Sequence, residues 1–275
     1  MNDRILSTNP VLARRAGISR AAVILTATLL LTTSLHAGQI TVAAAADLKF
    51  ALDELTAEFH TNQPGISVKV TYGSSGSFYT QLQNQAPFDI FFSADVAYPR
   101  KLVAAGLALD TNVFLYAVGR IVVWVPKASP VDIEKLGIQS LFAPSVQKIA
   151  IANPKHAPYG VAAMAAMKSL GVYDQAEPKL VFGENVAQTV QFVESGAADI
   201  GVIALSLAVA PQMRDSGRYW EIPLNAYPKM EQGGIIMNWT KEAEAARAFR
   251  DFVLGQHGRA VLKRNGFFLP EKLEK

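Results

Sequence analysis

The chain has 275 residues, half of them hydrophobic, and no cysteine. This length is enough for a large core and for two lobes. The lack of cysteine excludes disulfides, thiolate metal sites, a lipid-anchored cysteine and a cysteine nucleophile. Of 26 basic and 23 acidic side chains, 22 of each remain when residues 1–37 are set aside. A chain without net charge gives no indication of a nucleic-acid partner.

The first 37 residues have the order of parts found in a secretory signal. Four arginines precede an apolar run over 21–31, and a short polar segment then ends at Ala37. A basic region, a short apolar region and a small residue at the cleavage point are typical of such signals. The apolar run is too short for a membrane span. We therefore expect residues 1–37 to be a signal peptide, cleaved near Ala37, and the mature protein to be periplasmic.

Beyond residue 37, short apolar runs alternate with helical patterns almost to the end of the chain. Strands are predicted at 40–46, 66–72, 88–93, 120–125, 148–152, 179–182, 199–204 and 218–223. Helices are predicted at 48–61, 77–85, 97–105, 158–170, 186–195, 242–254 and 257–264. This alternation predicts an α/β fold with mostly parallel sheets flanked by helices.

No long linker separates the two lobes that the length allows, so strands or tight crossings must connect them. The segments 120–125 and 218–224 are the candidates. We predict that residues 38–121 and 213–275 form lobe 1 and that residues 122–212 form lobe 2. The cleft between them would collect loops from the carboxyl ends of strands, where ligands of α/β proteins bind.

The stretch Tyr72-Gly-Ser-Ser-Gly-Ser77 lies between a predicted strand and a predicted helix. A helix start there would offer free backbone N–H groups, hydroxyl donors and the positive end of the helix dipole. Those features suit an anion. The alternative is an ordinary turn in which a serine caps the helix.

Three more junctions combine a strand end, small or polar residues and a helix start. They are Ala43-Ala-Ala-Ala-Asp47, Asn153-Pro-Lys-His-Ala-Pro-Tyr-Gly160 and Gly183-Glu-Asn-Val186. Pro158 fits the first turn of the helix that follows the second of these. Each junction alone is an ordinary helix start, but four of them, two from each half, favour an anion site between the lobes.

With Pro87-Phe-Asp-Ile-Phe-Phe-Ser-Ala-Asp95, Val122-Val-Trp-Val-Pro-Lys127 and Asn265-Gly-Phe-Phe-Leu-Pro270, these motifs resemble the periplasmic molybdate-binding proteins of ABC importers. The resemblance covers residues 38–270. It implies a two-lobed, type II periplasmic binding protein with its ligand in the interlobe cleft. The implied ligand is molybdate, and tungstate as well. The protein would be a monomer without cofactor or enzymatic activity, delivering the ligand to a membrane permease and its ATPase.

In that family, neutral donors alone hold the tetrahedral oxyanion. Carried over to this chain, they would be the hydroxyl and N–H of Ser75 and the backbone N–H groups of Tyr159 and Val186. Molybdate would thus be bound through its oxygen atoms. The family's tyrosine from the last strand of lobe 2 falls at Ala204, where no hydroxyl is present. The phenol of Tyr159 or Tyr79 is our hypothesis for its replacement.

The family's serine in the first junction falls at Asp47 or, with a one-residue shift, at Ala46. Molybdate carries no proton at neutral pH, so a carboxylate facing it would repel it, whereas phosphate keeps a proton and can use an acceptor. Asp47 aimed into the cleft would therefore disfavour molybdate. We expect instead that Asp47 caps its own helix and that only N–H groups of residues 46–48 reach the anion.

Two other interpretations remain open. The first is a binding protein for another oxyanion, such as sulfate or phosphate. The second, more remote, is a secreted serine hydrolase, although a Gly-x-Ser-x-Gly elbow would need glycine where Ser77 stands. We expect His156 to structure its loop and not to bind a metal, because no second ligand stands at a recognisable spacing.

Overall fold

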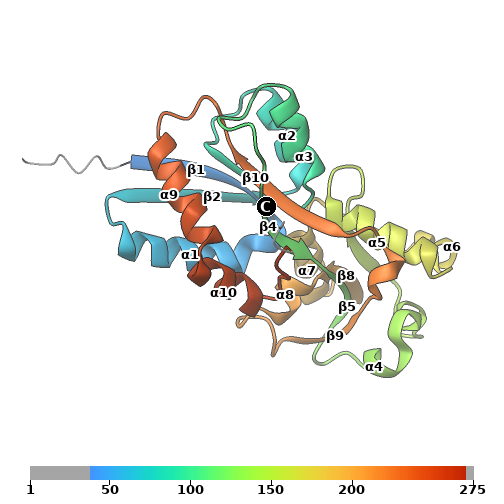
Figure 1. The fold of residues 1–275 in the computed structure, drawn as a ribbon. Coiled ribbons are helices and arrows are strands. Elements are labelled where there is room, and N and C mark those ends of the chain that lie inside the picture. Colours follow the sequence, from blue (N-terminus) through green and yellow to red (C-terminus); the bar gives the residue numbers. More distant parts are fainter. Residues whose placement is uncertain (1–37, 271–275) are drawn as a thin grey trace, which may run out of the picture. The chain divides into compact units, whose positions relative to one another are not determined.

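The computed structural model describes residues 38–270, whose strands form two five-stranded sheets (Figure 1). The predicted signal peptide lies outside the described residues. The first sheet has the order β2-β1-β3-β10-β4. Its strands are β1 (Gly38–Ala45), β2 (Ile66–Gly73), β3 (Ile90–Ser93), β4 (Phe114–Gly119) and β10 (Met230–Ile236). The second sheet has the order β7-β6-β8-β5-β9. Its strands are β5 (Ile121–Pro126), β6 (Ile149–Ala152), β7 (Leu180–Gly183), β8 (Ile200–Ala204) and β9 (Gly217–Glu221).

Helices follow most of the strands, and none in the described part of the chain is long and apolar enough to cross a membrane. Those of the first half are α1 (Lys49–Asn62), α2 (Ser75–Gln83), α3 (Ala97–Ala104), α9 (Ala243–Leu254) and α10 (Gln256–Arg264). Those of the second half are α4 (Ile133–Leu136), α5 (Pro158–Ser169), α6 (Tyr173–Ala176), α7 (Val186–Glu194) and α8 (Leu205–Val209).

Both sheets are mixed, with most of their strands running in one direction, as predicted. In the first sheet β2, β1 and β3 are parallel neighbours, while β10 is antiparallel to both β3 and β4. In the second sheet β5 is the one reversed strand, antiparallel to β8 and β9. Each sheet therefore has four strands in one direction and one against them.

Alternation along the strands covers both faces of the first sheet. Phe91 packs with Phe78 and Leu82 of α2, whereas Ile90 and Phe92 belong to the cluster that includes residues of α1, α9 and α10. Side chains of a strand point to opposite faces in turn, so one strand serves two helical layers. This double burial explains why the first three residues of Ile90–Ser93 are all large and apolar.

The chain crosses between the sheets twice. It leaves the first sheet between β4 and β5 and returns over residues 222–229, between β9 and β10. Strand β9 pairs with β5, so the second sheet extends to Glu221. The lobe boundaries we drew at 121 and 212 stay a prediction, although this pairing places residues 217–221 with the second sheet.

Candidate functional site

Three helices start near one another from the two halves of the molecule: α2 at Ser75, α5 at Pro158 and α7 at Val186. The first N–H groups of a helix have no partner inside it. Within residues 38–270, no protein acceptor lies within hydrogen-bonding reach of the backbone N–H of Ser75, Tyr159 or Val186. These are the three N–H groups that the resemblance implied for an anion.

Ser75 is completely buried, and its Oγ accepts a hydrogen bond from the N–H of Ala94 at 2.9 Å. A hydroxyl that accepts in this way still has its own proton to donate. Ser74 has a different task, because its Oγ accepts from the N–H of Ser77 and caps α2. Ser75 is therefore the serine of this stretch whose hydroxyl is available as a donor.

The other predicted positions come together around apolar contacts. Ala46, Tyr159, Val186 and Ala204 belong to one cluster of buried residues, which also contains Ala94, the partner of Ser75. Ala204 ends β8 and contributes no side-chain polar group. Residues from all four predicted junctions, two in each half of the chain, therefore belong to this cluster or hydrogen-bond to it.

Our expectation that Asp47 caps its helix is wrong. The helix α1 begins at Lys49 without a side-chain cap, and Asp47 lies in a short 3-10 helix, η1 (Ala46–Leu48), with 2% of its surface exposed. Its Oδ2 accepts from Tyr159 Oη at 2.9 Å and from Gln232 Nε2 at 2.8 Å. A buried carboxyl group needs donors, and here they come from α5 and β10 instead of the following turn.

Burial raises the pKa of the Asp47 carboxyl from its usual 3.8 to about 6, although the hydrogen bonds from Gln232 and Tyr159 oppose the shift. Burial, with the charge of Asp47, also raises the pKa of the Tyr159 phenol well above its ordinary value. The phenol is therefore neutral and acts as a donor. Gln232 Nε2 lies 3.1 Å from Tyr159 Oη, so the three side chains form one buried network.

Sequence reasoning did not identify Gln232. Gln232 is a fully buried amide beside two glycines in β10, and the sequence could have indicated it only if β10 had been recognised as a strand. A residue with Cβ in place of Gly119 would bring that atom within 2.6 Å of both Gln232 Nε2 and Tyr159 Oη. The chain can pass from β4 to β5 this close to the side chains of Gln232 and Tyr159 because Gly119 has no side chain.

The two tyrosines proposed to replace the missing hydroxyl differ in their surroundings. The phenol proton of Tyr159 is directed to Asp47 Oδ2. The ring of Tyr79 lies 5.2 Å from that of Tyr98, between α2 and α3. The replacement stays a hypothesis for both.

His156 connects the two halves. Its carbonyl oxygen accepts from the N–H of Gly76 at 2.9 Å, and its Nδ1 lies 2.8 Å from Ser74 Oγ. Its Nε2 lies 3.4 Å from Glu184 Oε2, a largely exposed carboxylate. No group of three metal-ligating side chains occurs in residues 38–270. His156 thus holds the start of α2 against the loop that precedes α5.

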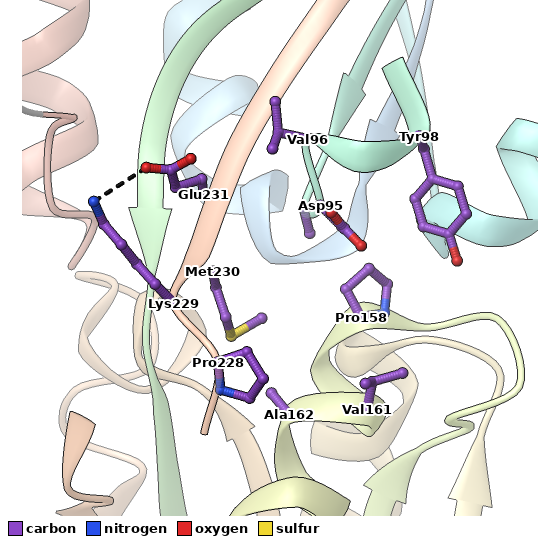
Figure 2. A pocket seen from close by; sticks show the side chains of 11 residues that line it. Asp95, Val96, Tyr98, Pro158, Val161, Ala162, Pro228, Lys229, Met230 and Glu231 are labelled. Atoms are coloured by element: carbon purple, nitrogen blue, oxygen red, sulfur yellow. Dashed lines mark ion pairs between the residues drawn. The ribbon is translucent and has the colours of Figure 1, made fainter. Parts of the chain in front are cut away.

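A cavity of about 220 Å³ lies beside this region, between the starts of α3, α5 and β10 (Figure 2). Its charged lining residues are Asp95, Glu231 and Lys229, with Lys229 Nζ 3.1 Å from Glu231 Oε1. One negative charge is left in excess, which disfavours an anion. None of the predicted oxyanion positions lines this cavity, so it is a separate feature.

Comparison with known proteins gives a consistent result. The family model described as bacterial extracellular solute-binding protein matches residues 40–268. The molybdate-binding protein ModA of Rhodobacter capsulatus is 35% identical over 231 residues, covering 84% of this chain and 88% of that protein. ModA of Azotobacter vinelandii is 34% identical over 240 residues, covering 87% and 94%.

Solved structures agree with these matches. The periplasmic molybdate-binding protein of Azotobacter vinelandii superposes with a TM-score of 0.78 at 34% identity, covering 84% of this chain and all of that one. The sulfate-binding protein SubI of Mycobacterium tuberculosis has a TM-score of 0.68 at 15% identity, covering 86% and 88%, and shares the fold alone.

Proposed function

Because the chain belongs to the bacterial extracellular solute-binding proteins, we propose that its solute is a tetrahedral oxyanion, namely molybdate, with tungstate as a close analogue. Relatives named as molybdate-binding proteins, at 34–35% identity over most of the chain, support the choice of ligand. The mature protein would be exported, bind the anion and deliver it to the permease and ATPase of an ABC importer.

One observation carries the proposal. Ser75, Tyr159 and Val186 each have a buried position at or next to a helix start, and their N–H groups have no protein acceptor within the described residues. Helix starts carry partial positive charge and bind anions without any charged side chain. Neutral donors suit an oxyanion that must be released again to a membrane partner.

The donors come from both halves of the chain, which suggests a hinged clamp. Ser75 belongs to the half with the first sheet, whereas Tyr159 and Val186 belong to the half with the second. An anion that contacts both sets stabilises the arrangement in which they face each other, and only this differential affinity can drive closure. Binding and release would need no chemical step.

A second candidate ligand has one observation in its favour. The buried carboxyl group of Asp47 is an acceptor when it is ionised, and phosphate is an oxyanion that keeps a proton for such an acceptor. Phosphate, and sulfate as a proton-free comparison, therefore belong in the experiment that tests the ligand.

Calorimetric titration of the mature protein with molybdate, tungstate, sulfate and phosphate tests the proposal. Molybdate and tungstate should bind with similar affinity because they share charge and shape, and sulfate should bind more weakly. Equal affinity for sulfate would remove the selectivity, and no binding of any of the four would refute the oxyanion function.

The absence of catalysis is also part of the proposal. Ser74, His156 and Glu184 lie in a row that superficially resembles a hydrolase triad, but Ser74 Oγ is engaged with both the N–H and the Oγ of Ser77. An esterase assay on purified protein should show no turnover. Turnover that is lost in Ser74→Ala would contradict a pure binding role.

A further inference from the structure

We propose that Asp47 controls which anions the site accepts: an unprotonated tetrahedral dianion binds only together with one proton, which is carried on Oδ1 of Asp47. This inference rests on the proposed oxyanion function and specifies how the same site responds to the protonation of its ligand. It assigns Asp47 a role as a specificity-determining residue that a neutral serine or amide could not have.

The two carboxyl oxygens of Asp47 have different surroundings. Oδ2 accepts two hydrogen bonds, from Tyr159 Oη and from Gln232 Nε2. Oδ1 is buried, and no hydrogen-bond partner lies near it among the described residues. A proton on Oδ2 would meet the two donors already directed there, whereas a proton on Oδ1 meets none. Protonation therefore converts Oδ1 from an unpaired acceptor into a donor.

The network fixes the direction of these hydrogen bonds. Tyr159 Oη accepts from Gln232 Nε2 and so gives its own proton to Asp47. The hydroxyl of Ser206 donates to the backbone oxygen of Asp47 at 2.9 Å, which holds η1 in place from the side of α8. With its backbone held by Ser206, Asp47 cannot turn its carboxyl group away to solvent without breaking the two hydrogen bonds at Oδ2.

Among the described residues, no cation forms an ion pair with Asp47. The helix η1 packs against α1, β2, α7 and α8, and Asp47 contacts α5 and β10. The titratable groups that act on it are Tyr159 of α5 and Tyr116 of β4. The packed elements also carry Lys49 and Asp53 on α1 and Tyr72 on β2, with Glu194 at the far end of α7. Lys49 is the cation of this set, and its Nζ is paired with Asp53 Oδ2 at 3.0 Å.

A carboxylate and a dianion cannot share such a site without a large electrostatic cost. Two like charges a few ångströms apart repel strongly where water is excluded. Burial, opposed by the hydrogen bonds from Gln232 and Tyr159, already places the pKa of Asp47 at about 6. A dianion bound beside it raises that pKa further, so binding near neutral pH takes up a proton from solution. The neutral carboxylic acid then adds one donor to those of Ser75, Tyr159 and Val186.

The affinity for molybdate should therefore depend on pH, although molybdate itself does not change its protonation in this range. Molybdate and sulfate are unprotonated dianions around neutral pH, so a change in their affinity must come from the protein. The affinity of the wild-type protein for molybdate should fall about tenfold between about pH 7 and about pH 8, because each pH unit above the pKa of the free protein costs a factor of ten.

The experiment is calorimetric titration with molybdate at these two pH values, in two buffers that differ in ionisation enthalpy. Wild type should take up about one proton per anion. Asp47→Asn keeps the shape and a donor but does not titrate, so its affinity should be independent of pH and its proton uptake zero. Asp95→Asn is the matched control, because Asp95 lines the neighbouring cavity, and it should keep the wild-type slope.

The outcomes separate the inference from the function on which it rests. Molybdate binding by wild type with a flat pH profile and no proton uptake would overturn the inference alone. So would phosphate binding more tightly than molybdate at the higher pH without proton uptake, because Asp47 would then act as an acceptor. If neither protein binds any of the four oxyanions, the proposed function fails as well. The proton count on wild type decides the matter even if Asp47→Asn does not fold.

Discussion

Ser75 carries the side-chain hydroxyl that we propose as a donor to the anion. It is buried, and within residues 38–270 the one protein partner of its Oγ is the N–H of Ala94. Hydrogen bonds to charged groups contribute about 1.5–3 kcal/mol. Ser75→Ala should therefore weaken molybdate binding by roughly ten- to a hundredfold.

Calorimetry on the mature protein measures this loss. Ser77→Ala, two residues further along the same helix, is the control, because the Ser77 hydroxyl contacts Ser74 and not the site. A negligible loss in Ser75→Ala would show that the hydroxyl does not face the anion.

The carboxyl group of Asp47 should also affect stability in the absence of ligand. Its pKa is raised from 3.8 to about 6 by folding, so the folded state binds the proton more tightly than the unfolded state. The stabilisation from this proton is fully present below about pH 4 and is lost as the pH rises through about 6. Two pKa units correspond to about 3 kcal/mol.

Asp47→Asn removes this titration. Relative to wild type, the variant should gain up to about 3 kcal/mol in the free energy of unfolding between about pH 4 and about pH 8. Urea unfolding of both proteins at the two pH values measures the difference. A constant difference would mean that the carboxyl is not buried as described.

Some of these residues follow from the sequence and others do not. Ser75, Tyr159 and Val186 stand at junctions whose local pattern predicts a helix start, and the structure places each of them there. The direction of the Asp47 side chain depends on partners 112 and 185 residues away, Tyr159 and Gln232. Local capping rules consider only the turn that follows the residue, and for that reason they predicted the wrong partner for the Asp47 carboxyl group.

At the scale of elements, the contact between α2 and the loop before α5 is very close. A Cβ at Gly76 would lie 2.5 Å from the carbonyl oxygen of His156 and 2.9 Å from its Cα. Both are backbone atoms of His156, so an alanine at position 76 cannot be accommodated by a small shift of a side chain. Gly76 is required by the approach of the two halves and not by the helix itself.

Gly76→Ala should therefore separate two properties. Alanine is the better helix former by up to about 1 kcal/mol, so the melting temperature without ligand should not fall. The molybdate affinity should fall, because the loop of His156 can no longer approach. Thermal unfolding and calorimetry on the same preparation measure both. Unchanged affinity would mean that this contact is absent from the bound state.

Eight of the ten strands in residues 38–270 were predicted from the sequence, and the two that were missed, β4 and β10, have different causes. Strand β4 is separated from β5 by residue 120 alone, and the sequence pattern predicted one strand there, at 120–125. Strand β10 contains Gly233 and Gly234, which weaken the strand pattern. A Cβ at Gly234 would lie 2.4 Å from the carbonyl oxygen of Phe91 and 2.5 Å from the ring of Phe114. The tight packing that requires glycine in β10 is thus the reason why the sequence pattern did not predict this strand.

At the scale of the whole molecule, the fold class is confirmed. Two mostly parallel sheets with helices, as predicted, occur together with a TM-score of 0.78 to a solved periplasmic molybdate-binding protein. The alternation of strands and helices was sufficient for this result because it is set by burial along each segment. The sequence did not show which strand ends each half, because β9 is assigned to the second half by its pairing with β5.

A clamp with donors in both halves should change its dimensions when it binds. Small-angle scattering of the mature protein should give a smaller radius of gyration with saturating molybdate than without it, because the anion favours the arrangement in which both sets of donors meet. Sulfate at the same concentration serves as the control for ionic strength. Superimposable profiles with and without molybdate would contradict the clamp.

The pairing of β10 between β3 and β4 also constrains the order in which the chain can be completed. Every strand of the second sheet precedes β10 in sequence, so that sheet can close while the first is still divided into β2-β1-β3 and a solitary β4. Until residues 230–236 are present, β3 has an unpaired edge, and such edges associate readily with other chains. A protein that emerges from its N-terminus thus completes last the half that it began first, and the late-arriving strand β10 is also the one that brings Gln232 to Asp47.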